Sequence, residues 1–141
     1  KMEFDIHDFP NLARQKRGRY FYTGIINAHG YPWNLKIFPG GSDGSKIDVE
    51  HVSIFLAYAG ENTETNPVVA KAFIRTRTIN FELPKHEYYK KGKQSFGYDD
   101  FGTREDIIEN NCDDTGTLTI TVELQVATEK RSVWYPQLTY S

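Results

Sequence analysis

The sequence predicts an all-β protein, an antiparallel β-sandwich, and three observations support this fold class. Apolar and polar residues alternate with a period of two in several segments, as they do in strands with one buried and one solvated face. Glycine, proline and other turn-forming residues separate these segments. No segment carries a helical pattern of apolar residues long enough for a major helix.

Six segments have the composition of strands. In chain order they cover residues 3–6, 19–24, 33–38, 51–59, 68–83 and 117–127. The third directs Trp33, Leu35 and Ile37 to one face and ends at Pro39, which cannot donate to a sheet ladder. The inward face of the last strand consists of Leu118, Ile120, Val122, Leu124 and Val126. We therefore expect both segments to line the core.

The segments at 68–83 and 84–116 are harder to interpret. The first is rich in β-branched residues and too long to remain flat, so we expect one strand with a bulge or bend. The second is polar, aromatic and interrupted by glycines, which is typical of an exposed loop. Within it we expect at most one short helix near 103–110, because Thr103 can cap its start and Asp106 follows three residues later.

The length of 141 residues fits a single domain, and since the sequence starts at Lys1 we expect residues 1–141 to be one domain of a longer protein. A formal net charge of -2 offers no overall attraction to nucleic acid, and no apolar run approaches the roughly 20 residues that span a bilayer. The single cysteine, Cys112, favours a reducing compartment, the cytoplasm or the nucleus.

No set of residues in the sequence has the spacing of a catalytic or metal site. The histidines are scattered without metal-ligand spacing, and acidic neighbours of Cys112 disfavour a reactive thiolate. The loop aspartates lack the alternating spacing of a calcium loop. We therefore expect no enzyme activity, no cofactor and no metal.

Two charged or aromatic groups stand out. The basic cluster of Arg14, Lys16, Arg17 and Arg19 is interpreted as a solvated turn, with phosphate contact or a targeting signal as alternatives. Aromatic residues make up 14% of the chain, and several lie opposite the apolar stripes or among glycines after residue 87. Such rings are common anchors for peptides. In the alternative, either Phe96 or Tyr98 packs in the core and the other faces water.

The order of motifs resembles the MATH (meprin and TRAF homology) domain, a TRAF-like family. The motifs are FDIHDF at 4–9, FYTG at 21–24, WNLKIFPGG at 33–41, VSIFL at 52–56, FGYDDF at 96–101 and GTLTITVELQV at 116–126. The pattern is most similar to that of ubiquitin-ligase adaptors such as the speckle-type POZ protein. The resemblance implies an eight-stranded antiparallel sandwich that binds short extended peptides and selects substrates for a ligase.

The resemblance also implies the residues of the binding groove. They are Phe55, Tyr88, Gln94, Ser95, Phe96, Tyr98 and Asp99. Phe73 joins them if the register of its strand allows. The sequence departs from the family at Ser95, where the signature has an aspartate, and at Asp99 and Asp100, where the ligase adaptors have a lysine pair. We therefore expect peptide binding in the same place with a different consensus.

Other interpretations remain open. The domain could instead be the docking domain of an enzyme such as a ubiquitin-specific protease, or a sandwich that binds carbohydrate or lipid through the same rings. Phosphorylation of the ligand could help through Lys85, Lys90, Lys91 and Lys93, or harm through the two aspartates. No heptad segment is present, so we expect a monomer in isolation.

Overall fold

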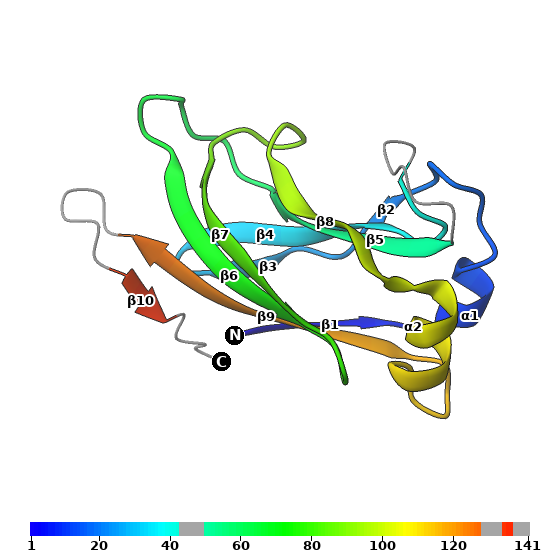
Figure 1. The fold of residues 1–141 in the computed structure, drawn as a ribbon. Helices are drawn as coiled ribbons and strands as arrows, with labels where there is room; N and C mark the ends of the chain where they lie inside the picture. The colour runs from blue at the N-terminus through cyan, green and yellow to red at the C-terminus, as the bar shows by residue number, and fades with distance from the viewer. Residues whose placement is uncertain (43–49, 128–133, 137–141) are drawn as a thin grey trace.

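The computed structural model describes residues 1–42, 50–127 and 134–136. Within these ranges, ten strands form two antiparallel sheets that pack face to face (Figure 1). We name the sheets after a strand inside each, the β9 sheet and the β5 sheet. One-sided alternation of apolar residues makes this packing necessary, because each sheet has an apolar face to bury.

The β9 sheet has the strand order β1–β9–β6–β7, and β10 also pairs with β9. Its strands are β1 (Met2–Ile6), β6 (Val68–Arg75), β7 (Asn80–Tyr88), β9 (Leu118–Ala127) and β10 (Trp134–Pro136). Since β6 occupies one side of β9, β1 and β10 share the other side. Together they form one interrupted edge.

The β5 sheet has the strand order β2–β4–β5–β8, and β3 also pairs with β4. Its strands are β2 (Phe21–Tyr22), β3 (Ile26–Ala28), β4 (Tyr31–Phe38), β5 (His51–Tyr58) and β8 (Ser95–Thr103). Here β2 and β3 share one side of β4. The ten strands thus fill eight positions, and the predicted eight-stranded antiparallel sandwich is confirmed.

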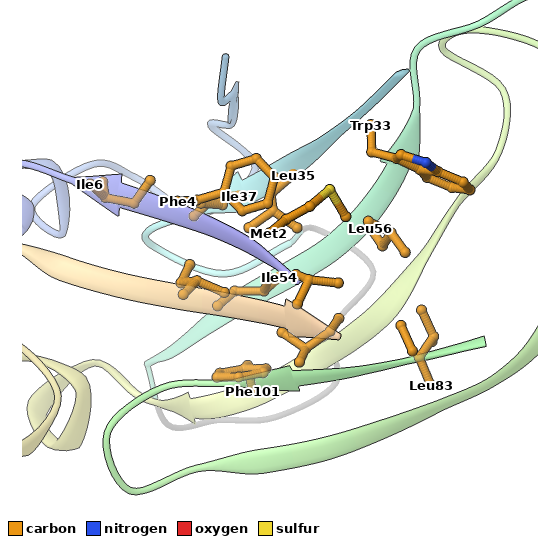
Figure 2. Packing of buried hydrophobic residues seen from close by; sticks show 14 of the residues in the cluster. Met2, Phe4, Ile6, Trp33, Leu35, Ile37, Ile54, Leu56, Leu83 and Phe101 are labelled. Carbon is orange, nitrogen blue, oxygen red and sulfur yellow. The ribbon is translucent and has the colours of Figure 1, made fainter. Parts of the chain in front are cut away.

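The core lies between the sheets and is built from the predicted inward faces. Trp33, Leu35 and Ile37 of β4 are completely buried, and so are the inward residues of β9 from Leu118 to Leu124. Figure 2 shows side chains from both sheets meeting in this layer. None of the helices in the described ranges has the length and apolarity to cross a bilayer.

The prediction of one long strand over 68–83 is wrong, because the chain reverses at residues 76–79 to form the β6–β7 hairpin. The Thr76 amide donates to the Ile79 carbonyl at 2.9 Å. The side-chain oxygen of Asn111 then accepts hydrogen bonds from the Thr76 hydroxyl (2.6 Å) and from the Thr78 amide (2.8 Å) and hydroxyl (3.1 Å). A residue from distant sequence therefore stabilises the turn, which local composition does not reveal.

The prediction of an exposed loop over 84–116 is also wrong for much of its length. The segment contains the end of β7 and all of β8, which pairs with β5. Pro84 lies within β7, and this is tolerated because β7 is the edge strand of its sheet. Mixed polar and aromatic composition concealed both strands.

The predicted helix is present as α2 (Arg104–Asn110), and the Thr103 hydroxyl caps it by accepting from the Asp106 amide at 3.1 Å. A further short helix, α1 (Phe9–Leu12), was not predicted. It has a proline in its first turn, and its Phe9 side chain is fully buried. The Asn11 side-chain amide also donates to the Asp8 carboxylate, so local contacts stabilise this single turn.

Candidate functional site

The candidate site surrounds β8, the edge strand of the β5 sheet. Among the described strands, β8 pairs only with β5, and on its other side it contacts β7, the edge strand of the β9 sheet. The two sheet edges thus meet along one side of the sandwich. We call this line the β7–β8 seam.

Phe55 lies on the outer face of the β5 sheet, where its neighbours follow from the register. It pairs with Lys36 of β4 and with Gly97 of β8. Its ring is half-buried and meets the Phe38 ring edge-on, with the ring centroids 5.8 Å apart. Because Gly97 has no side chain, the flank of the Phe55 ring toward β8 is not covered by its cross-strand partner.

Gly97 is required by the close approach of β8 to β5. A Cβ atom at this position would collide with the Ile54 carbonyl oxygen and would lie 2.7 Å from the Phe55 Cα. No larger residue fits without moving one of the strands. Ser95, two residues earlier, pairs with Ala57 on the same outer face and is half-buried.

Asp99 is exposed but already engaged in a hydrogen-bond network with the turn after β4. The Ser42 hydroxyl donates to Asp99 Oδ1 at 2.5 Å. The buried Ser53 hydroxyl donates to the Asp99 carbonyl at 2.7 Å and accepts from the Ser42 amide at 3.1 Å. Asp100 lies beside the buried His51, whose Nε2 is 2.9 Å from Asp100 Oδ1. Both aspartates thus stabilise the local fold, a role that the sequence did not reveal.

Phe96 and Tyr98 both turn toward the β7–β8 seam. The Phe96 ring stacks on the His86 ring with a centroid distance of 3.9 Å and an angle of 2°. The Tyr98 ring stacks on Phe81 at 4.4 Å, and its hydroxyl donates to the Glu82 carbonyl. Both residues are half-buried, so the alternative in which one packs in the core and the other faces water is wrong.

Tyr88 lies beneath the seam and is fully buried. Its ring meets Trp33 edge-on at 5.0 Å and Phe96 edge-on at 5.2 Å. Burial raises the pKa of the Tyr88 phenol well above its ordinary value, and its hydroxyl has no hydrogen-bond partner among the described residues. Tyr88 therefore supports Phe96 from below and presents no surface of its own to a ligand.

A depression of about 470 Å³ opens beside Phe96. Its lining residues are Lys85, His86, Glu87, Tyr89, Lys93, Gln94 and Phe96. The Gln94 side-chain oxygen accepts from the amides of Tyr89 (3.2 Å) and Lys90 (2.6 Å), and so holds the β7–β8 turn in place. Burial lowers the pKa of the His86 imidazole, which favours the neutral ring that stacks on Phe96. The depression thus combines an aromatic wall with two ammonium groups.

Phe73 does not join this site. It lies on the outer face of the β9 sheet, with the Arg75 guanidinium 5.1 Å from its ring centroid and Glu82 and Glu123 as its cross-strand partners. It lines a separate depression of about 430 Å³ on that face. The condition set for Phe73 is therefore not met, because its register places it on the outer face of the β9 sheet.

Cys112 lies outside this site, in an isolated bridge with Leu118 of β9. Burial and the nearby Asp113 raise the pKa of the Cys112 thiol, so the reactive thiolate is disfavoured. Among the described residues, no group of three or more histidine, cysteine, aspartate or glutamate side chains is placed to hold a metal ion. What the site offers is an aromatic, partly open surface at a sheet edge.

A two-layer sandwich with half-exposed rings at a sheet edge defines a class of binding domains rather than a particular protein. The comparison with protein families is more specific: the model of the MATH domain family matches residues 1–124, so this chain belongs to that family. MATH domains generally serve as protein-interaction modules. No curated protein sequence matches the chain.

Proposed function

We propose that this domain binds a short extended segment of a protein partner along β8, and that it recruits this partner to a ubiquitin-ligase adaptor. The observation that carries the proposal is the geometry of β8. Among the described strands it has a partner on one side only, and it carries Ser95 and the half-exposed Phe96 ring next to the depression of about 470 Å³. An extended peptide gains affinity from backbone hydrogen bonds at such an edge and selectivity from pockets for its side chains.

The predicted groove residues take different roles in this proposal. Phe55, Ser95 and Phe96 contact the peptide, and Gln94 shapes the wall of the depression. Tyr88 and Tyr98 position Phe96 and the seam, since Tyr88 is buried and the Tyr98 hydroxyl is bonded to β7. Asp99 marks the far end of the site.

The charges along β8 suggest the polarity of the ligand. Lys85 and Lys93 line the depression at the start of the strand, and Glu87 is the acidic residue there. Asp99 and Asp100 follow at the other end. A peptide with an acidic group near Phe96 and a basic one near Asp99 complements this gradient. We therefore expect a consensus that differs from that of the ligase adaptors the sequence resembles.

A peptide array probed with two matched variants tests the site. Phe96→Ala removes the aromatic wall, whereas Phe73→Ala removes a ring from the opposite sheet. Peptides that the parent and Phe73→Ala bind, and that Phe96→Ala binds roughly ten times more weakly, would support the proposal. Equal binding by Phe96→Ala, or no binding by a well-folded parent, would overturn it.

The recruitment role needs the full-length protein in cells. We expect a cullin to co-precipitate with both the parent and Phe96→Ala, while the peptide-bearing partner is recovered only with the parent. The single buried cysteine fits action in the cytoplasm or nucleus, and the isolated domain is expected to be a monomer. Recovery of the peptide-bearing partner without any cullin would favour the alternative in which this chain is the docking domain of an enzyme.

A further inference from the structure

The large apolar side chains that are exposed within the described ranges all lie in one short segment, 20–25. Tyr20 is 51% exposed, Tyr22 is 43% exposed and Ile25 is 52% exposed. The segment includes β2 and belongs to one edge of the β5 sheet, because β2 and β3 pair with the same side of β4. Exposed apolar side chains that gather at one place are typical of an interaction surface.

Four exposed cations directly precede these apolar side chains. They are Arg14, Lys16, Arg17 and Arg19. No carboxylate of the described residues forms an ion pair with Arg14, Lys16 or Arg19. Residues 9–42 contain no aspartate or glutamate, although the whole chain has a formal net charge of -2. Positive charge and exposed apolar groups thus adjoin one another, and we call residues 14–25 the basic rim.

Backbone contacts fold the basic rim against the β5 sheet. The Gly18 amide donates to the Gly41 carbonyl at 2.8 Å, which ties the cationic part to the turn after β4. The Thr23 amide donates to the Leu35 carbonyl at 2.9 Å, and the Thr23 hydroxyl accepts from the Leu35 amide at 2.9 Å. Figure 1 shows the loop that links α1 to β2 at one end of the sandwich. The cations and the apolar side chains therefore form one preformed surface.

Two features of the basic rim disfavour a peptide or a nucleic acid as its ligand. β2 spans two residues and β3 spans three, so neither offers a long strand edge to an extended peptide. The Tyr20 ring has the Lys36 ammonium 4.3 Å from its centroid and the Phe38 and Tyr22 rings against it at 5.3 and 5.8 Å. These contacts occupy the ring on which a nucleic-acid base would stack.

We propose that the basic rim docks this domain on the surface of a membrane that contains anionic phospholipids. The cations of the rim attract the lipid headgroups, and Tyr20, Tyr22 and Ile25 enter the interfacial layer. Tyrosine suits this layer because its ring is apolar while its hydroxyl remains hydrated. The cytoplasmic leaflet of cell membranes carries lipids of this charge. The proposal does not depend on the β8 site, which lies at the other edge of the β5 sheet.

Sedimentation with lipid vesicles tests the proposal. The 141-residue chain is mixed with vesicles of phosphatidylcholine alone, or of phosphatidylcholine with roughly 30% phosphatidylserine. We expect binding only to the vesicles that contain phosphatidylserine, with an affinity that falls at least tenfold between about 0.05 M and about 0.5 M NaCl. Equal binding to both kinds of vesicle, or under about 10% bound at a lipid concentration of about 5 mM, would overturn the proposal.

Two double variants of equal net charge locate the contact. Arg14→Gln combined with Lys16→Gln should bind at least ten times more weakly, because each cation near the membrane contributes about fivefold. Lys90→Gln combined with Lys91→Gln removes two exposed cations from the β7–β8 turn and should bind like the parent. An equal loss in both double variants would show that the attraction is not specific to the basic rim, and would contradict the assignment.

The apolar contact has its own readout at Ile25. Ile25→Ser should weaken vesicle binding by about fivefold, since an apolar side chain no longer enters the interfacial layer. Ile25→Trp introduces a fluorescent reporter, and its emission should shift to shorter wavelength with phosphatidylserine vesicles but not with phosphatidylcholine vesicles. Unchanged binding by Ile25→Ser together with an unshifted emission of Ile25→Trp would rule out the proposed docking mode.

Two further arms separate the basic rim from the β8 site and from other ligands. Phe96→Ala should sediment with the vesicles like the parent, so the two proposals can fail independently. Titrations with a DNA duplex and with a soluble peptide rich in Asp and Glu test other polyanions. Tighter binding to either of them than to phosphatidylserine vesicles would overturn the assignment of a membrane.

Discussion

At the β8 edge of the β5 sheet, the rings of Phe96 and Tyr98 turn toward the other sheet and stack on His86 and Phe81. At the β2 edge, the rings of Tyr20 and Tyr22 face solvent and surround Lys36. Aromatic residues that look alike in the sequence thus close a seam at one edge and form an open platform at the other. The difference arises because side chains of β7 stack on the rings of β8, while no described strand lies beyond β2 in the β5 sheet.

Replacing the ring beneath the seam should have the largest effect. Tyr88→Ala leaves a cavity next to Trp33 and Phe96 and should lower the free energy of unfolding by about 3–5 kcal/mol. Tyr88→Phe should be neutral or stabilising, because the buried hydroxyl has no partner among the described residues. Urea denaturation measures both. Tyr22→Ala, at the platform, should cost under about 1 kcal/mol, and an equal loss at both edges would contradict the comparison.

The two edges should also differ in their tolerance of a methyl group. Gly97→Ala forces a Cβ against the Ile54 carbonyl and should destabilise the domain by about 1–3 kcal/mol. Gly24, just after β2, has no atom within 4 Å of its Cβ position, so Gly24→Ala is the matched control and should be nearly neutral. Thermal unfolding followed by circular dichroism distinguishes them. A harmless Gly97→Ala would mean that β8 lies farther from β5 than described.

Alkaline pH should destabilise the domain in part through Tyr88 of the seam. The pKa of Tyr88 in the folded state is raised above the value of 10.0 that applies to the unfolded chain. The folded state therefore retains its proton when the unfolded state loses it, and stability present below pH 10 declines as the pH rises further. Between pH 10 and 11 the loss should amount to about 1 kcal/mol. Tyr88→Phe should reduce this decline in pH-dependent urea titrations; an identical slope would show that other groups cause it.

The smallest effect is expected from single hydroxyl groups. Tyr98→Phe removes the hydrogen bond to the Glu82 carbonyl and should cost about 0.5–1.5 kcal/mol. Tyr20→Phe removes a hydroxyl that makes no hydrogen bond within the described ranges and should cost nothing measurable. Equal stability of the two variants would indicate that the Tyr98 bond contributes no net stabilisation to the seam.

Much of the fold was predictable because alternation assigns residues to the core directly. The inward faces of β4 and β9 and the cap of α2 were correctly identified from local patterns. The β6–β7 reversal was missed, since Asn111 stabilises that turn through hydrogen bonds to residues 35 and 33 positions away. The strand β8 was hidden by its own mixture of glycine, aspartate and aromatic residues.

The candidate site was less predictable than the fold. The aromatic composition drew attention to Phe55 and Phe96, which are half-exposed, but it gave the buried Tyr88 the same weight. From the sequence alone, the basic cluster was interpreted as an ordinary solvated turn. The cluster consists of Arg14, Lys16, Arg17 and Arg19. A local count of charge would have revealed the basic stretch, because residues 9–42 lack any acidic residue. Its position beside the tyrosines required the β2–β4 register.

The sequence by itself determined the sandwich, because a two-residue period of apolar side chains commits one face of each strand to a common core. It also determined the local charge, which is a property of composition. Only the tertiary structure decided which rings are available to a ligand. Exposure depends on neighbours that are remote in the chain, such as His86 against Phe96 from β7 and Lys36 against Tyr20 from β4.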